Sequence, residues 1–339
     1  MENSDIHLCQ ETLKGHSNSV DAMTYDQESK TLFSGSQDET VKVWTPDGSG
    51  EYRASPTQTL TGHSGSVRAL ALDQDSKTLF SGSEDLTSGI IKVWTRDDSG
   101  NYTVSQTLSG HNSDWVRALT YDQDTKVLFS GSGDLTSGII KVWTPDGSGN
   151  YQKDATQTLS GHNNSYVLSL AYDQDTKVLF SGSYDKTIMV WTPDDSGNYT
   201  ATQTLSGHSD WVIELAYDQT ENTLFSASFD DTIKVWTPNG SGGYHASSTQ
   251  TLTGHSGAVY ALAYDQDTKT LFSGSHDNTV KVWTPDGSGS WSRWRQNASS
   301  TQTLTGHSDY VQTLAYDQDT KTLFSADING TINVWTTRK

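Results

Sequence analysis

Hydrophobic and polar positions alternate along this chain in short runs, and the same order of runs returns seven times. In the unit that begins at Gly254, apolar residues alternate with small or polar ones over 258–265, 270–275 and 279–284. A fourth short run, 301–305, leads to the next unit. Alternation of period two, with β-branched residues between Gly, Asp and Asn turns, is typical of strands. Each unit therefore predicts four short strands, and no segment has helical periodicity.

A Gly-His pair opens each unit, and a Trp ends its third strand. A period of 46 to 52 residues between the pairs indicates a repeat architecture, in which neighbouring units share one continuous core. We therefore expect one domain over residues 1–339, although the length alone would allow two. The histidines are His16, His63, His111, His162, His208, His255 and His307, and the tryptophans are Trp44, Trp94, Trp143, Trp191, Trp236, Trp283 and Trp335.

The two ends of the chain complement each other. The seventh unit stops just after Trp335 without a fourth strand, and residues 6–13 form an extra strand-like run before the first Gly-His pair. If this run pairs with the last unit, the circle closes and no sheet edge stays unpaired. The sequence thus predicts an all-β ring completed by its N-terminal strand.

The repeated motifs resemble those of the WD40 repeat family over essentially the whole chain. They are Gly-His, Ser-Gly-Ser-x-Asp as in 34–38, and Val-Lys-Val-Trp as in 41–44. The resemblance implies a seven-bladed β-propeller whose blades are four-stranded antiparallel sheets. One motif departs from the family pattern, because the Trp is followed by Thr, as in Thr45, and not by Asp. That Asp is frequently replaced in the family, so the expected fold is unchanged.

The resemblance also implies a structural tetrad in each blade, a hydrogen-bonded chain of His, Ser or Thr, Asp and Trp. Ser34 and Ser36 are both candidates for the hydroxyl, and we favour Ser34 because its counterpart is present in every unit. The seventh unit has Asn329 at the Asp position, which predicts an uncharged acceptor and the least rigid blade. The implied tetrads are His16, Ser34, Asp38, Trp44; His63, Ser81, Asp85, Trp94; His111, Ser130, Asp134, Trp143; His162, Ser181, Asp185, Trp191; His208, Ser226, Asp230, Trp236; and His255, Ser273, Asp277, Trp283.

Recurrence of Ser, His and Asp argues against catalysis. A catalytic triad is needed once, in a cleft with an oxyanion hole, whereas this set occurs about six times beside a Trp. The Gly-Ser-Gly loops lack the Gly-Lys-Ser/Thr ending of a phosphate-binding loop. Asp122 and Asp124 lack the Gly and final Glu of a calcium-binding EF-hand loop, and a turn accounts for them. We expect no enzyme activity, no cofactor and no metal site.

Charge narrows the choice of partner. The net charge of −19 repels nucleic acid, and no Lys/Arg cluster offsets it. The acidity either only keeps the surface soluble or attracts a basic partner.

The single cysteine, Cys9, fits a reducing compartment. The start of the chain lacks the features of a signal peptide, and no run is long enough to span a membrane. We expect a cytoplasmic or nuclear protein that is neither secreted nor membrane-bound.

Aromatic residues outside the repeat template indicate the binding surface. In WD40-like propellers their repeat positions surround the mouth of the central channel, where partners commonly bind. Trp and Tyr bury much area at little entropic cost, although these side chains alternatively pack on their own loops and fill the mouth. The polar positions nearby include Asp21, Gln312 and His276. The predicted partner-binding residues are Trp115, Tyr166, Leu168, Tyr184, Trp211, Ile213, Phe229, Tyr260, Tyr310, Arg68, Arg117 and Glu84.

The function that we predict is a non-catalytic scaffold that binds a peptide or loop of another protein at this mouth. Two alternatives stay open. One is a carbohydrate-binding propeller whose aromatic residues stack on sugars. The other is an architectural subunit of a larger complex, with Trp291 and Trp294 as contacts on the opposite face. The near-identity of the repeats fits either recent duplication or a consensus-like design.

Overall fold

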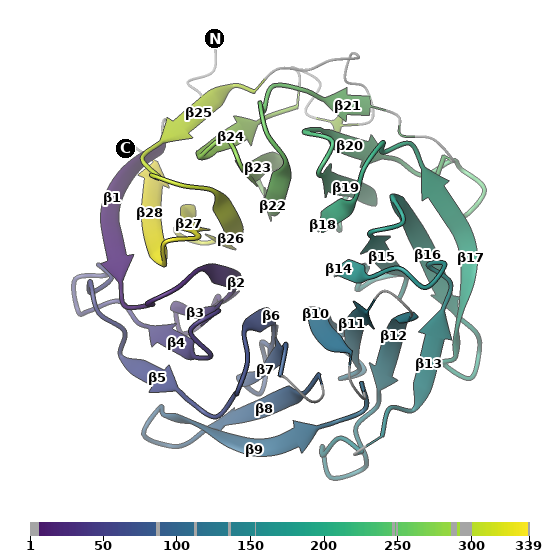
Figure 1. The fold of residues 1–339 in the computed structure, drawn as a ribbon, viewed down its shortest axis with the longest axis horizontal. Helices are drawn as coiled ribbons and strands as arrows, with labels where there is room; N and C mark the ends of the chain where they lie inside the picture. The colour runs from purple at the N-terminus through teal and green to yellow at the C-terminus, as the bar shows by residue number, and fades with distance from the viewer. Residues whose placement is uncertain are drawn as a thin grey trace.

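Seven four-stranded antiparallel sheets surround a central channel in the computed structural model, and each sheet is one blade of a ring (Figure 1). The structure describes residues 7–85, 89–111, 114–134, 137–152, 154–245, 248, 250–285, 290–291 and 300–337. The predicted all-β propeller with seven blades is therefore confirmed. No helix within these described ranges is long and apolar enough to cross a bilayer.

The strands of a blade follow one another from the channel outward (Figure 1). Blades one to four comprise β2 Val20–Asp26, β3 Thr31–Ser36, β4 Val41–Trp44, β5 Gln58–Leu60; β6 Val67–Asp73, β7 Thr78–Ser83, β8 Ile91–Arg96, β9 Tyr102–Leu108; β10 Trp115–Tyr121, β11 Leu128–Asp134, β12 Ser137–Trp143, β13 Gln157–Ser160; and β14 Val167–Tyr172, β15 Leu179–Ser183, β16 Thr187–Pro193, β17 Tyr199–Ser206. Blades five to seven comprise β18 Val212–Asp218, β19 Thr223–Ser228, β20 Ile233–Trp236, β21 Gln250–Leu252; β22 Val259–Asp265, β23 Thr270–Ser275, β24 Thr279–Trp283, β25 Gln302–Thr305; and β26 Val311–Asp317, β27 Thr322–Asp327, β28 Thr331–Thr337, β1 His7–Lys14.

The N-terminal strand closes the ring, as predicted. β1 pairs antiparallel with β28, and Leu13 lies opposite Ile332. The strand ends one residue later than the predicted 6–13, and Ile6 lies outside the described residues. The outer edge of β28 is thereby covered, so the last blade has the same four strands as the others.

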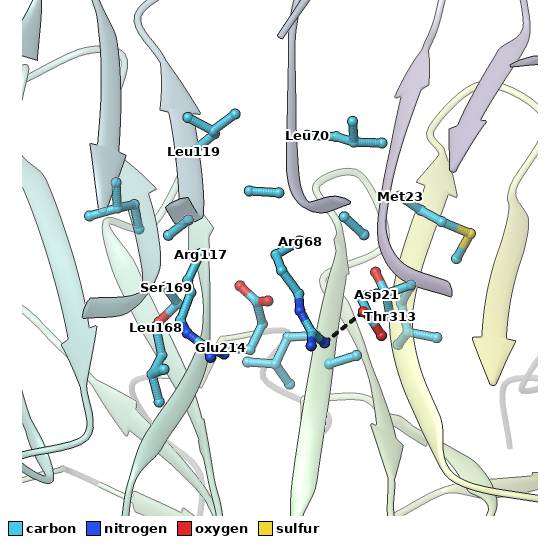
Figure 2. Close-up of a pocket in the computed structure, with 17 residues that line it drawn as sticks. Asp21, Met23, Arg68, Leu70, Arg117, Leu119, Leu168, Ser169, Glu214 and Thr313 are labelled. Atoms are coloured by element: carbon cyan, nitrogen blue, oxygen red, sulfur yellow. Dashed lines mark hydrogen bonds and ion pairs between the residues drawn. The ribbon is translucent and has the colours of Figure 1, made fainter. Parts of the chain in front are cut away.

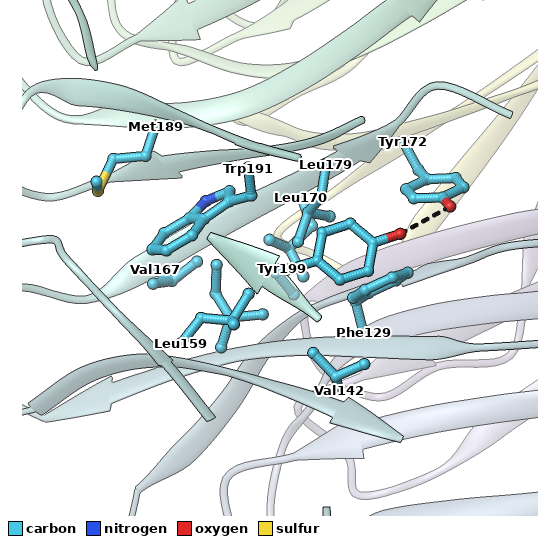
Figure 3. Packing of buried hydrophobic residues seen from close by; sticks show 12 residues of the cluster. Phe129, Val142, Leu159, Val167, Leu170, Tyr172, Leu179, Met189, Trp191 and Tyr199 are labelled. Carbon is cyan, nitrogen blue, oxygen red and sulfur yellow. Dashed lines mark hydrogen bonds between the residues drawn. The ribbon is translucent and has the colours of Figure 1, made fainter. Parts of the chain in front are cut away.

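The hydrophobic core lies between blades. In the cluster of Figure 3, Phe129 and Val142 of blade three pack with Val167 and Trp191 of blade four. Strand β3 is buried at every residue, because adjacent blades cover both faces of its sheet. One blade cannot bury its apolar faces alone, so the stability of each depends on its neighbours.

One phenylalanine in the second strand of each blade meets an aromatic ring from the next blade. Phe129 contacts Tyr199 at 5.1 Å between ring centroids and 81° between planes. In blade six Trp291 fills this position, because it meets Phe225 at 77° and donates its indole N–H to the hydroxyl of Tyr264 at 3.1 Å. Trp291 is only 1% exposed. The suggestion that it is a contact on the opposite face is therefore wrong, and Trp294 lies outside the described residues.

A closed ring of hydrogen bonds joins all seven blades just beyond the C-terminal ends of the innermost strands. The backbone N–H of each glutamine donates to the side-chain oxygen of the glutamine in the next blade, at 3.0 to 3.3 Å. The sequence predicted only turns here. The ring stabilises the bottom of the channel through contacts that no single repeat contains. Its members are Gln27, Gln74, Gln123, Gln174, Gln219, Gln266 and Gln318.

The structural tetrad is complete in blades one, four, five and six. In blade one the indole of Trp44 donates to Ser34 Oγ at 2.8 Å, which lies 2.7 Å from His16 Nε2. His16 Nδ1 lies 2.8 Å from Asp38. Burial alone would raise the pKa of Asp38, but hydrogen bonds from His16 and Thr40 hold that pKa well below its ordinary value. The hydroxyl that joins Trp and His is that of Ser34 and not that of Ser36.

Blades two and three depart from the implied tetrad at its Asp, next to the extra Leu-Thr-Ser-Gly segment that only these blades carry. His63 Nδ1 lies 3.5 Å from Asp85, whose carboxylate accepts hydrogen bonds from Ser64 and Ser83 instead. His111 still bonds Ser130, but its Nδ1 has no hydrogen-bond partner among the described residues, and the side chain of Asp134 lies outside them. Burial lowers the pKa of His111 to about 3.

Blade seven keeps a charged acceptor, contrary to the prediction from Asn329. Asp327, two positions earlier, lies 2.9 Å from His307 Nδ1, and Ser325 and Trp335 complete the set. Asp327 occupies the repeat position of Ser36 in blade one. Its carboxylate therefore approaches the imidazole of His307 from the end of β27. The prediction that Asn329 supplies an uncharged acceptor is therefore wrong, and the reason for expecting this blade to be the least rigid no longer applies.

Candidate binding site at the channel mouth

One β-bulge interrupts the start of the innermost strand in every blade. In blade one the pairing of β2 with β3 skips a residue between Val20 and Ala22, and the other six blades repeat this shift. A bulge breaks the alternation of a strand and re-aims a side chain. The bulge residues are Asp21, Arg68, Arg117, Leu168, Ile213, Tyr260 and Gln312.

All seven bulge residues line one cavity of about 490 Å³ at the channel mouth. Tyr166, Tyr184, Trp211, Phe229 and Glu214 complete its wall. The bulges thus bring side chains from seven repeats, each about 48 residues from the next, to one place. In a regular strand without a bulge, these side chains would point to one face of the blade's sheet.

A second, smaller cavity of about 200 Å³ continues the channel inward (Figure 2). Its wall includes the residue that follows each bulge, which is Ala, Ser or Thr in six blades and Glu214 in blade five. Glu214 lines both cavities. Glu214 was not among the predicted site residues, although it is the one charged residue at this repeat position. The six short residues are Ala22, Ala69, Ala118, Ser169, Ala261 and Thr313.

The blade four to blade six side of the mouth is a continuous aromatic arc. Tyr184 and Trp211 stack with ring centroids 3.9 Å apart and 24° between planes. Trp211 contacts Phe229 at 4.8 Å, and Phe229 meets Tyr260 edge-on at 6.2 Å. Tyr166 joins the arc through Tyr184 at 5.7 Å. We call these five rings the aromatic arc. Its members are in mutual contact and also border the cavity, so they form a preorganised wall.

The blade one to blade three side of the mouth is ionic. Arg68 bridges Asp21 and Glu84 at 2.6 and 3.0 Å, and Arg117 lies 2.9 Å from Glu84. The guanidinium of Arg117 also lies over the rings of Trp115 and Tyr166, at 5.1 and 5.2 Å. Both arginines therefore already have carboxylate partners within the protein.

Glu214 forms no ion pair with any described residue. Its carboxylate accepts a hydrogen bond from the backbone N–H of Leu215, at 3.0 Å. Burial in the channel raises the pKa of Glu214 to about 8, and the hydrogen bond from Leu215 opposes that rise only in part. In Figure 2 the side chains of Arg68, Arg117 and Glu214 all point into the cavity. Among the described residues, no Lys or Arg side chain pairs with this carboxyl group in the channel.

Nine of the twelve predicted partner-binding residues line the mouth cavity. Trp115, Tyr310 and Glu84 do not. Trp115 lies at the rim with 38% of its surface exposed, Tyr310 packs against His276, and Glu84 pairs with both arginines. The nine are Tyr166, Leu168, Tyr184, Trp211, Ile213, Phe229, Tyr260, Arg68 and Arg117. The cavity adds Asp21, Gln312 and Glu214, of which only Glu214 had not been singled out.

The repeated Ser-His-Asp sets are not arranged for catalysis. Each serine oxygen accepts the N–H of the blade tryptophan and is completely buried, as Ser34 and Trp44 show, so no substrate reaches it. Across the described residues, no group of three or more His, Cys, Asp or Glu side chains is placed to hold a metal ion.

Comparisons with known proteins agree with this geometry. The family model described as "WD domain, G-beta repeat" matches seven segments, residues 7–45, 54–95, 102–144, 153–192, 199–237, 246–284 and 298–336. Among solved structures, the chain is similar to the WD40 beta propeller domain of Doa1, with a TM-score of 0.75, 23% identity and 98% of each chain covered. No curated protein matched the sequence. The Doa1 likeness supports the fold alone, whereas the seven segments span most of the chain and each covers the outer strand of one blade and the three inner strands of the next, so this protein belongs to the WD40 repeat family.

Proposed function

We propose that this protein is a non-catalytic scaffold that binds a peptide or loop of a partner protein at the channel mouth. WD40 propellers are in general protein-interaction domains. The observation that carries the proposal is the aromatic arc, which borders an open cavity of about 490 Å³ instead of being sealed in the core. Clustered Trp, Tyr and Phe side chains of this kind supply most of the binding energy in protein interfaces.

The charge supports a basic partner and argues against nucleic acid. The whole chain carries −19, a field that attracts cationic segments and repels phosphate backbones. We also propose a cytoplasmic or nuclear location, because the one cysteine, Cys9, is free and exposed, as suits a reducing compartment.

The test compares Trp211→Ala with Val104→Ala in affinity purification from the source cell. Val104 is a matched control, because it is 42% exposed on the outer strand β9, far from the mouth in Figure 1. We expect Trp211→Ala to lose a set of proteins that Val104→Ala retains, with little change in melting temperature. Binding of the purified partner is then measured directly, and a loss of more than about tenfold is expected.

Two results would contradict the proposal. In the first, Trp211→Ala retains every partner, and Phe229→Ala does so as well. In the second, the wild-type protein binds defined glycans on an array and Trp211→Ala abolishes that binding, which favours the carbohydrate-binding alternative. A large fall in melting temperature with partner binding intact would mean that the arc is structural.

A further inference from the structure

Glu214 is the one charged residue at its position in the seven repeats. The other six blades place Ala, Ser or Thr directly after the bulge. A carboxyl group in this narrow part of the channel costs free energy, because it loses much of its hydration. Its own strand provides one hydrogen bond, from Leu215. The second carboxylate oxygen is left to face the cavity.

The charges around Glu214 leave a place for one cation. Five charged side chains meet at the mouth: Arg68, Arg117, Asp21, Glu84 and Glu214. The two arginines are engaged by Asp21 and Glu84, and Arg117 is further held between Trp115 and Tyr166. An incoming cation would therefore meet Glu214 without having to displace an existing ion pair.

The aromatic arc borders the same cavity as this carboxyl group. Trp211, Phe229 and Tyr260 line the same cavity as Glu214, and Trp211 is only three residues before it on the chain. Aromatic faces attract cations and also pack against methylene groups. A long, slender side chain with a terminal positive charge fits a cavity of about 490 Å³ that shares Glu214 with an inner cavity of about 200 Å³.

We propose that the mouth binds a lysine side chain of the partner, with its methylene groups along the aromatic arc and its ammonium group against Glu214. The proposal rests on the proposed function and names the partner's chemistry. Lysine is favoured over arginine because Leu215 already occupies one oxygen of Glu214. The remaining oxygen suits the single-point charge of an ammonium, whereas a guanidinium prefers both oxygens of a carboxylate.

The probe is a short acetylated and amidated peptide, Ala-Ala-Lys-Ala-Ala, titrated at millimolar concentration into protein labelled with ¹⁵N at tryptophan. The indole signal of Trp211 is assigned from its absence in Trp211→Phe. We expect this signal to shift saturably with the lysine peptide. The peptide with norleucine, which keeps the methylene groups and lacks the charge, should bind about tenfold more weakly or not at all.

Glu214→Gln provides the matching change in the protein, because it preserves shape and removes the charge. We expect about a tenfold loss of affinity for the lysine peptide. The control is Glu39→Gln, an exposed glutamate between β3 and β4, which alters the net charge equally and should bind as the wild type does. Equal affinity in Glu214→Gln and wild type, equal binding of the norleucine peptide, equal binding of the same peptide with arginine in place of lysine, or no shift at all would overturn the proposal.

The affinity should also depend on pH. An ammonium group favours the ionised carboxylate, so binding releases a proton from Glu214 and becomes tighter as pH rises from about 6 to about 9, while lysine stays charged. Asp21, Arg68, Arg117, Tyr166, Tyr184 and Tyr260 also face the cavity. Burial raises the pKa of Asp21, and its ion pair with Arg68 opposes that rise. If Glu214 is the group responsible, the affinity of Glu214→Gln for the lysine peptide should not change with pH.

The outcomes separate this inference from the scaffold proposal. If Trp211→Ala loses protein partners and Glu214→Gln retains them at full affinity, the scaffold proposal stands and the lysine site is wrong. If neither variant loses a partner, the scaffold proposal is wrong, and the lysine site, which rests on it, is wrong as well. Unchanged melting temperature of Glu214→Gln shows that any loss of binding is not a loss of fold.

Discussion

His307 and Asp327 form the hydrogen bond on which the tetrad of the last blade depends, with 2.9 Å between Nδ1 and the carboxylate. The same carboxylate accepts the backbone N–H of Asn329 and of Thr331. Asp327 is 1% exposed. Asp327 thus pairs with the tetrad histidine of blade seven as Asp38 does with that of blade one, although the two residues occupy different repeat positions.

Replacement of Asp327 by Ala should therefore destabilise the protein by about 2 to 4 kcal/mol, because it leaves a buried imidazole and two backbone N–H groups unpaired. Asn329→Ala removes only exposed contacts and should cost less than about 0.5 kcal/mol. Urea denaturation at pH 7 measures both. Equal costs would show that Asn329 shares the acceptor role.

Trp291→Ala should destabilise the protein by about 3 to 5 kcal/mol, the usual cost of removing a buried aromatic side chain. Trp291→Tyr restores the residue type that the equivalent position has elsewhere, as in Tyr199 and Tyr244, and should recover most of the loss. Denaturant unfolding of the two variants measures this difference. A tyrosine variant as unstable as the alanine variant would mean that the indole itself is required.

His111 should make stability depend on pH. Burial holds its pKa at about 3 in the folded protein, against about 6.5 in an unfolded chain. Between these values only the unfolded chain binds the proton, so the free energy of unfolding falls as pH is lowered from about 6.5. His111→Gln should reduce this slope by up to about 1.4 kcal/mol per pH unit.

Unfolding free energies between roughly pH 4.5 and 7 test the slope. His245→Gln is the control, because it removes an exposed histidine and should leave the slope unchanged. If His111→Gln and wild type have the same slope, the imidazole of His111 is not neutral throughout this range.

Gln174→Ala should break the glutamine ring. It leaves the N–H of Gln123 and the carbonyl of Tyr121 without their partners, at 3.0 and 2.8 Å in the intact ring. The expected cost is about 1 to 3 kcal/mol, and hydrogen exchange at Gln123 should accelerate. Gln152→Ala, which changes an exposed glutamine, should have no measurable effect on either quantity. Unchanged exchange at Gln123 would show that the ring does not protect this end of the channel.

The strands, the seven repeats and the closure of the ring are predictable from the repeated pattern, and the resemblance to the WD40 family adds the propeller. The alternation of each strand, the Gly-His pairs, and the tryptophan and phenylalanine positions are local features repeated in every unit, so each copy supports the same prediction. Comparison of the repeats also singled out most of the side chains at the mouth, such as Trp211 and Tyr184. These are departures from a template, and the template is visible in the sequence.

Which side chains meet depends on the folded ring. The bulges place Ile213 and its six counterparts in one cavity, and alternation cannot reveal a bulge because the extra residue shifts the register of the strand. Trp291 reads as a loop residue until Phe225 and Tyr264 of neighbouring strands surround it. Glu214 differs from its six counterparts in the sequence itself, but strands from several blades create the cavity that it lines. In each case the deciding contact joins different blades, and the period-two pattern of one strand carries no information on which blade packs against it or how deeply its side chains are buried.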